Sequence, residues 1–140
     1  MTEYRSVPLV KQVCEALERE VNNAVRSQGL TYSQIQLLLR LEGAEDGGLP
    51  LKALEEMLNV SQATVVGLAK RLTRKGFAEL AGDPRDKRAK RVRLTPLGAV
   101  KCEEAHAHMD AIERKLNGGF TEIETRILFD LLRKAGDNFR

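Results

Sequence analysis

Cationic side chains are concentrated between Ser61 and Thr95. This segment holds ten lysines and arginines against three acids, a net charge of +7, whereas the other residues hold 13 cations and 17 acids, a net charge of −4. The overall charge of +3 therefore conceals a basic module on a mildly acidic body. A basic face of this kind is typical of proteins that contact the phosphate backbone of a nucleic acid.

Polar side chains stand at the start of a helix that the sequence predicts from about Ser61 to Lys75. Ser61 is a good N-cap, and Gly76 can end the helix. The head of such a helix reaches base edges in the major groove. Gln62 can form two hydrogen bonds with adenine, whereas Ser61 and Thr64 accept several partners, so we expect Gln62 to read sequence directly.

The cations later on this helix are expected to have a different role. Lys70, Arg71 and Arg74 should meet phosphates or brace the fold, which supplies affinity rather than sequence information. Gly67 lies mid-helix at a cost of about 1 kcal/mol relative to alanine. Two alternatives stay open for Gly67. It permits a close approach to DNA or to the preceding helix, or it reflects ordinary sequence drift.

A second, shorter helix is predicted just before this one. The apolar residues keep a helical period on either side of a break at residues 59–61. Asn59 tolerates the left-handed conformation that ends a helix, and Val60 is expected to fill the space between the two helices. Two short helices at a sharp angle form a helix-turn-helix, whose apolar positions are Leu51, Leu54, Leu58, Val60, Val65, Leu68 and Leu72.

A short basic hairpin is predicted directly after the helix-turn-helix. Two strand-like runs, Phe77 to Leu80 and Arg91 to Leu94, flank a turn-rich segment at residues 81–90. Such a two-stranded wing should enter the adjacent minor groove, where narrow A·T-rich DNA favours a guanidinium. The alternative is a solvated loop that is merely basic. The DNA-contacting candidates in the wing are Arg85, Asp86, Lys87, Arg88 and Lys90.

At these residues the chain resembles the MarR/SlyA family of winged helix-turn-helix transcription regulators. The resemblance covers nearly the whole chain, and it implies that Arg88 enters the minor groove while Asp86 stiffens the loop. Lys70 stands where the family often has an acid that braces the wing arginine. Either Asp86 or another acid acts as the brace, or the wing stays mobile until DNA arrives. The resemblance rests on Leu54, Leu58, Ser61, Thr64, Arg71-Leu72, Lys75-Gly76-Phe77, Asp83-Pro84-Arg85-Asp86-Lys87-Arg88 and Leu94-Thr95-Pro96-Leu97-Gly98.

Four further helices complete a mainly α fold, a winged helix-turn-helix with a two-stranded β wing and N- and C-terminal dimerisation helices. They are predicted at Val7 to Ser27, from Thr31 to Leu41, from Pro96 to Leu116, and after a capping box at Thr121 and Glu124. We expect a single domain over residues 1–140. About 30–96 form the DNA-binding part, and about 1–29 and 97–140 form the dimerisation helices.

The terminal helices carry apolar stripes that a 140-residue monomer has little left to cover. One alternative is that both stripes pack on their own winged module. We favour a homodimer, because two half-sites increase affinity and because the resemblance implies pairing through these helices. The resemblance also implies a pocket, lined by the first, second and fifth helices, for a small phenolic or anionic effector.

Cysteine and histidine offer weaker candidates for a second role. Cys14 lies near the reactive cysteine of peroxide-sensing members of the resembled family, although a cysteine on an apolar stripe is usually a small hydrophobe. Cys102, His106 and Asp110 share one helical face, but the ends of that row are about 12 Å apart and cannot close on one ion. We therefore expect no metal and no cofactor.

The sequence thus predicts a sequence-specific double-stranded DNA-binding transcriptional regulator, a homodimeric repressor that a small ligand modulates. It has no phosphate-binding glycine loop, nucleophile elbow or zinc-hydrolase motif, so we expect no enzyme. With no apolar run of about 20 residues and no signal peptide, we expect a cytoplasmic protein without membrane contact. Two alternatives stay open: an architectural or protein-interaction factor with little sequence preference, and a cysteine-based redox-sensing regulator.

Overall fold

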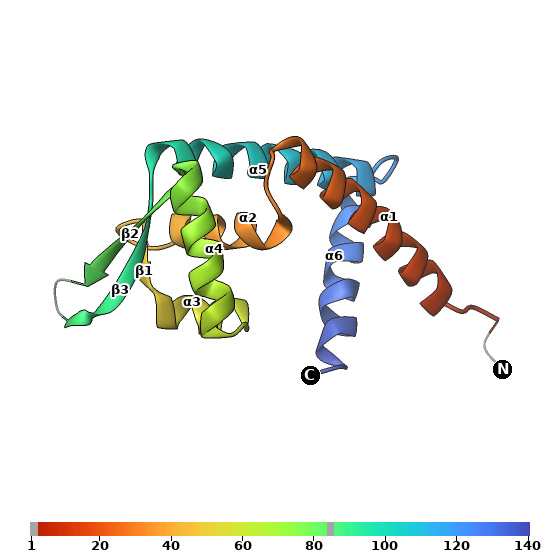
Figure 1. Ribbon diagram of the computed structural model, residues 1–140. Helices are drawn as coiled ribbons and strands as arrows, with labels where there is room; N and C mark the ends of the chain where they lie inside the picture. Colours follow the sequence, from red (N-terminus) through yellow and green to blue (C-terminus); the bar gives the residue numbers. More distant parts are fainter. Residues whose placement is uncertain (1–2, 84–85) are drawn as a thin grey trace.

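The computed structural model describes residues 3–83 and 86–140, and the side chains of these residues other than 83 and 86–89. In Figure 1, α5 runs across the top of the molecule, with the winged module at one of its ends and the two terminal helices near the other. The elements in chain order are α1 (Val7–Ser27), α2 (Tyr32–Glu42), β1 (Gly48–Pro50), α3 (Leu51–Leu58), α4 (Gln62–Lys75), β2 (Ala78–Asp83), β3 (Asp86–Leu94), α5 (Pro96–Leu116) and α6 (Glu122–Asp137).

The predicted caps of the helix-turn-helix are confirmed. Asn59 ends α3 in the left-handed conformation at φ 53°, and Gly76 ends α4 at φ 83°. The Ser61 hydroxyl accepts a hydrogen bond from the Thr64 N–H and so starts α4. The expected role of Val60 is wrong, because its side chain is 36% exposed. Leu54 of α3 and Val65 of α4 are fully buried in the core.

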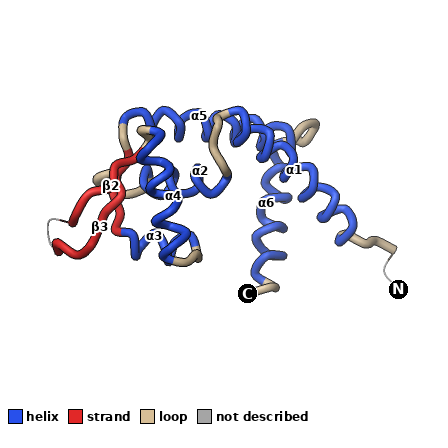
Figure 2. Tube along the Cα trace, viewed as in Figure 1, coloured by secondary structure: helices blue, strands red, loops and turns tan. Residues whose placement is uncertain are grey.

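The sheet has one strand more than the sequence predicts, and the wing strands are longer. Its order is β1-β3-β2, with both pairings antiparallel, and Figure 2 shows the wing strands extending away from the helices. The pairing of β2 with β3 continues out to Asp83 and Asp86, inside the segment expected to be a turn. The additional strand is β1, which follows α2 and pairs with residues 91–93 of β3.

One hydrophobic core joins the winged module to α5. Its members lie in the turn before α2, on the inner faces of α2, α3 and α4, on β2 and β3, and at one position of α5. Burying a leucine or valine side chain stabilises the fold by about 1.5 to 3 kcal/mol. The buried apolar residues are Leu30, Ile35, Leu37, Leu38, Leu41, Leu54, Val65, Leu68, Ala69, Leu72, Ala78, Val92 and Cys102.

The first turn of α5 lies directly against the chain segment that leaves α4. The Thr95 hydroxyl donates to the Gly76 carbonyl at 2.6 Å and accepts from the Gly98 N–H at 3.0 Å. A β-carbon at Gly98 would lie 2.1 Å from the carbonyl oxygen of Phe77. Glycine at this position therefore permits the close approach of α5 to the end of the recognition helix.

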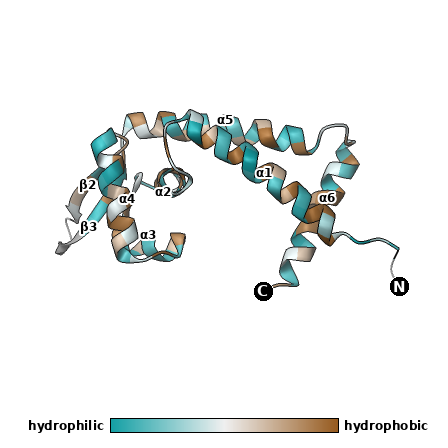
Figure 3. Cartoon of the chain, turned by 45° about the vertical axis from the view of Figure 1, so that its right-hand side comes forward, coloured by the Kyte–Doolittle hydropathy of each residue, from teal (hydrophilic) through white to brown (hydrophobic). Residues whose placement is uncertain are grey.

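The apolar faces of α1 and α6 remain largely exposed, which argues against the alternative that they pack on their own winged module. Helix α1 lies along α5, where Lys115 pairs with Glu20. Figure 3 shows apolar residues along α1 and α6, away from the winged module. Within the described residues, no helix is both long and apolar enough to cross a membrane. The exposed apolar side chains of these two helices are Val7, Leu9, Val10, Val13, Ile123, Ile127, Phe129, Leu131 and Leu132.

Candidate nucleic-acid interface

The head of α4 presents polar side chains to solvent. Ser61, Gln62 and Thr64 are all exposed. The hydroxyl oxygens of Ser61 and Thr64 lie 2.9 Å apart, and the Ser61 hydroxyl also caps the helix. Because these two hydroxyls are engaged with each other, Gln62 is the member of the group that is best placed to extend toward a ligand.

One face of α4 is buried and the opposite face is cationic. Val65, Leu68, Ala69 and Leu72 are buried in the core. The side chains of Lys70, Arg71 and Arg74 are exposed, so these three cations lie together on the outer side of the helix. This amphipathic arrangement places positive charge on the exposed face of the C-terminal half of α4, after the polar residues at its N-terminal end.

Gly67 lies on α4 among these residues. A β-carbon built at Gly67 would have no atom within 4 Å. The suggestion that Gly67 permits a close approach to the preceding helix is therefore wrong. An approach to DNA stays a prediction.

The wing continues the basic surface along β3. Lys90 is exposed on this strand, opposite Gly82 of β2. Arg85 lies outside the described residues. Asp86, Lys87 and Arg88 belong to β3, but their side chains are also outside the described part. Their expected contacts with a minor groove stay predictions.

Arg91 and Arg93 of the basic module form contacts that support the fold. Arg91 donates to the Gly48 carbonyl at 3.1 Å and pairs with Asp46 at 3.5 Å, and Arg93 lies 3.8 Å from the same carboxylate. A hydrogen bond from the Gly48 N–H, together with the charges of Arg91 and Arg93, holds the pKa of Asp46 below its ordinary value. Sequence analysis missed Asp46, since only the pairing of β1 with β3 brings it beside the arginines. Asp46 therefore braces the base of the wing, whereas the acid expected to hold Arg88 stays a prediction.

The cysteines and histidines do not converge on one site. Burial of Cys102, which is 1% exposed, raises the pKa of its thiol to about 11, and its thiol is therefore uncharged at neutral pH. His106 contacts the Glu42 carboxylate at 2.5 Å, across α5 and α2. Among the described residues, no three histidine, cysteine or acidic side chains come close enough together to hold a metal ion. Cys14 is exposed on α1, and its expected redox role stays a prediction.

A cavity lies between α1, α2 and α5. The family resemblance implies that these three helices line a pocket for a small effector. Its lining is mainly apolar, with amide, phenol and imidazole groups as the polar members. Such a lining is common in small-molecule sites, but the volume of this cavity is about 90 Å³, below the range of about 300 to 1,000 Å³ that is typical of them. The lining residues are Val21, Ala24, Val25, Gln28, Tyr32, Ile35, Gln36, Leu39, Ala105, His106, His108, Met109 and Ile112.

The fold and this surface define a winged helix-turn-helix protein of the DNA-binding class. A profile of the MarR family matches residues 28–89. The multiple antibiotic resistance protein MarR of Salmonella typhimurium is 30% identical over 127 residues, covering 90% of this chain and 87% of that protein. The chain therefore belongs to the MarR family, whose members are transcriptional regulators and not enzymes.

Two solved structures extend the comparison. A mutant of Escherichia coli MarR in complex with operator DNA is 27% identical with a TM-score of 0.73, covering 93% of this chain and 92% of that chain. BpsR of Bordetella bronchiseptica, whose DNA binding is regulated by 6-hydroxynicotinic acid, is 26% identical with a TM-score of 0.72, covering 98% of this chain and 99% of that chain. These likenesses confirm the predicted winged-helix architecture.

Proposed function

We propose that this MarR-family regulator binds a pseudo-palindromic operator as a homodimer and acts as a repressor. The observation that carries the proposal is the amphipathic α4, which buries its apolar face and exposes a polar head followed by Lys70, Arg71 and Arg74. The MarR of Escherichia coli binds operator DNA and has the same architecture. Two-fold symmetry in the protein would be mirrored by two half-sites about 10 bp apart.

In this proposal residues 30–96 contact DNA, and residues 1–29 and 97–140 join the two subunits. Ser61, Gln62 and Thr64 face the bases, and the cations of α4 contact phosphates. The wing contributes Arg85, Asp86, Lys87, Arg88 and Lys90. The exposed apolar faces of α1 and α6 support the assignment of pairing to the terminal helices, because a partner subunit would remove them from water.

Light scattering with and without DNA, together with competition by random DNA, tests the proposal. We expect a dimer in solution, two chains on each operator, and retention of the operator complex under an excess of random sequence. An architectural factor with little sequence preference would release the operator as random DNA is added. A stable monomer that binds one asymmetric site with full affinity would also contradict the proposal.

Gln62→Ala should weaken binding to the best site by about 1 to 3 kcal/mol and relax the preference at one base pair. The reason is its exposed place at the head of α4. Lys90→Ala is the matched comparison in the wing. It should weaken binding to all sequences about equally, and it should lower the salt slope, the slope of log affinity against log salt concentration, by about 1. Selection of DNA sites with each variant measures both effects. An unchanged selected motif with Gln62→Ala would show that another residue reads the base.

Arg88→Ala should lose more affinity on operators with A·T-rich flanks than on those with G·C-rich flanks. A narrow minor groove concentrates the negative potential that a guanidinium senses. Arg88→Lys should recover part of the loss, since an ammonium is more strongly hydrated and is harder to desolvate. Affinity for paired sites that differ only in their flanks, at one salt concentration, checks this. Equal losses of affinity on the two kinds of operator would show that Arg88 contacts phosphate and does not sense the minor groove.

The cavity between α1, α2 and α5 is our candidate for effector binding. Its amide, phenol and imidazole groups can exchange hydrogen bonds with a phenol or a small aromatic acid. BpsR offers a precedent, because a small aromatic acid regulates its DNA binding. A ligand there would alter operator affinity only if it bound the DNA-competent and incompetent conformations unequally.

A further inference from the structure

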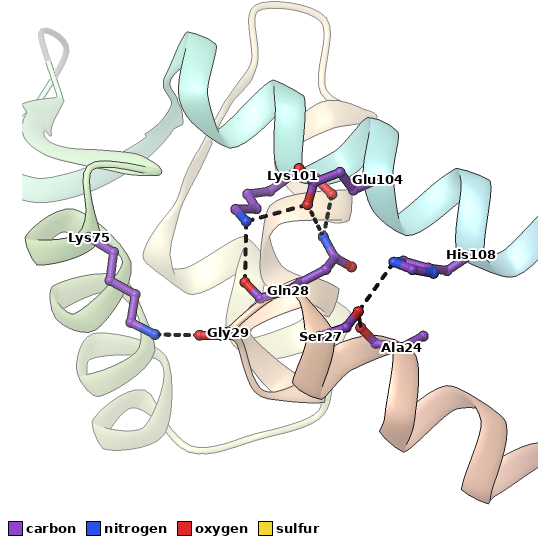
Figure 4. A network of polar contacts seen from close by, with 8 residues as sticks. All are labelled: Ala24, Ser27, Gln28, Gly29, Lys75, Lys101, Glu104 and His108. Atoms are coloured by element: carbon purple, nitrogen blue, oxygen red, sulfur yellow. Dashed lines mark hydrogen bonds and ion pairs between the residues drawn. The ribbon is translucent and has the colours of Figure 1, made fainter.

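The last cation of α4 differs from the others on that helix. Lys75 is exposed, but its Nζ reaches across the surface and donates to the Gly29 carbonyl at 2.9 Å. Figure 4 shows this contact between the end of α4 and the turn that joins α1 to α2. Gly29 holds this turn with φ at +71°, a conformation that favours glycine. Lys75 is thus engaged within the protein, unlike the outward cations earlier on α4.

A second cation reaches the neighbouring carbonyl of the same turn. Lys101 of α5 donates from Nζ to the Gln28 carbonyl at 3.2 Å and pairs with Glu104 at 3.3 Å. The same ammonium lies 5.5 Å from the ring centre of Phe77, directly after α4. The Gln28 side chain is 7% exposed, and its Nε2 donates to the Lys101 carbonyl at 2.9 Å. We call these five residues the junction: Gln28, Gly29, Lys75, Phe77 and Lys101.

The junction connects the C-terminal end of α4 to the turn that follows α1 and to α5. Its contacts are with the residues directly after α1 and with Lys101 in the first third of α5, while the N-terminal end of α4 lies in solvent. A 14-residue helix is about 21 Å long. A rotation of about 10° at the junction would therefore displace the head of α4 by about 3.6 Å, close to the rise of one base pair.

We propose that Lys75 is a positioning residue that sets the distance between the two recognition helices, and hence the half-site spacing that the dimer accepts. Its bond to the Gly29 carbonyl, together with the Lys101 contacts, holds the angle between α4 and the dimerisation helices. This inference rests on the proposed function as a dimer on two half-sites. It assigns Lys75 no contact with bases or phosphates.

The test compares the full-length protein with Lys75→Met on a series of operators whose half-sites are separated by one base pair more or less than the best spacing. The methionine keeps the packing of the side-chain stem and removes the donor. Loss of one hydrogen bond should reduce affinity for the best operator by about threefold to tenfold. The preference for the best spacing over its neighbours should fall by a similar factor, while the salt slope stays within about 0.3 of the wild-type value.

Arg74→Met is the matched control, because it removes the same charge one residue earlier from an outward position. It should lower the salt slope by about 1 and leave the spacing preference unchanged. Lys75→Arg should restore the spacing preference, since a guanidinium can also donate to the Gly29 carbonyl. Lys101→Met should broaden the preference as Lys75→Met does. The double variant should lose less of the spacing preference than the sum of the two single losses, because both lysines act on one turn.

A salt slope that falls by about 1 in Lys75→Met, with the spacing preference intact, would make Lys75 a phosphate contact and overturn the proposal. An intact spacing preference with only a lower unfolding midpoint would make it a structural contact and would overturn it equally. If Lys75→Met fails to fold, Lys101→Met decides by the same criterion. A wild-type protein without any spacing optimum would instead contradict the proposed dimeric function.

Discussion

Ile127→Glu in α6 is expected to convert the proposed dimer to a monomer and to weaken operator binding by about 100-fold or more. The Ile127 side chain is 51% exposed in the single chain, so the carboxylate costs the fold of one subunit little. In a dimer the same position would bury a charge in an apolar interface. Loss of pairing removes the advantage of binding two linked half-sites, which is typically 10² to 10⁴ in affinity.

Arg133→Glu is the matched control, because it introduces the same side chain on another side of α6. Arg133 lies against the ring of Phe129, 5.7 Å from its centre, and is also exposed. Light scattering gives the mass of each variant, and titration of labelled operator gives its affinity. A dimeric Ile127→Glu protein with wild-type affinity would place the subunit contact away from α6.

Gly98→Ala should destabilise the fold by about 3 kcal/mol, at the upper end of the cost of overpacking. The added methyl group would lie 2.1 Å from the Phe77 carbonyl and 2.7 Å from Cδ1 of Leu94. The backbone atom cannot move aside as a flexible side chain can, so the first turn of α5 must shift. Urea denaturation measures the loss in the free energy of unfolding.

Gly67→Ala is the same change at a site where the β-carbon meets nothing within 4 Å. It should stabilise α4 by about 0.8 to 1 kcal/mol through helix propensity alone. Equal stability of Gly98→Ala and the wild type would mean that α5 does not lie as close to Phe77 as the structure has it.

The features that local chemistry determines could be predicted from the sequence. Thr31 with Gln34, and Thr121 with Glu124, both form the capping boxes that their spacing predicts. The left-handed Asn59 and Gly76 stop their helices where expected. Each of these signals involves residues within four positions of one another, so no knowledge of tertiary packing is needed.

The features that depend on distant partners could not be predicted in this way. Strand β1 is three residues long and exists because it pairs with residues 91–93, more than 40 positions later. Asp46 becomes a brace only through that pairing. The same reasoning applies to Lys75, because its bond to the Gly29 carbonyl depends on the tertiary approach of the end of α4 to the turn after α1.

The candidate DNA-binding site likewise has features that the local sequence determines and others that depend on distant partners. The exposure of Gln62 and of the outward cations of α4 follows from the helical period, because Val65, Leu68 and Leu72 fix which face is buried. The length of the wing does not follow from composition. Its strands continue through residues that favour turns, since β2 and β3 pair out to Asp83 and Asp86.

Selection of bound fragments from a random DNA library, with the full-length protein, tests the central claim most directly. We expect enrichment of a pseudo-palindrome whose half-site centres lie about 10 bp apart, bound by two chains. Recovery of fragments without a shared motif, or of an asymmetric motif bound by a single chain, would contradict the claim that this protein reads DNA as a two-fold dimer.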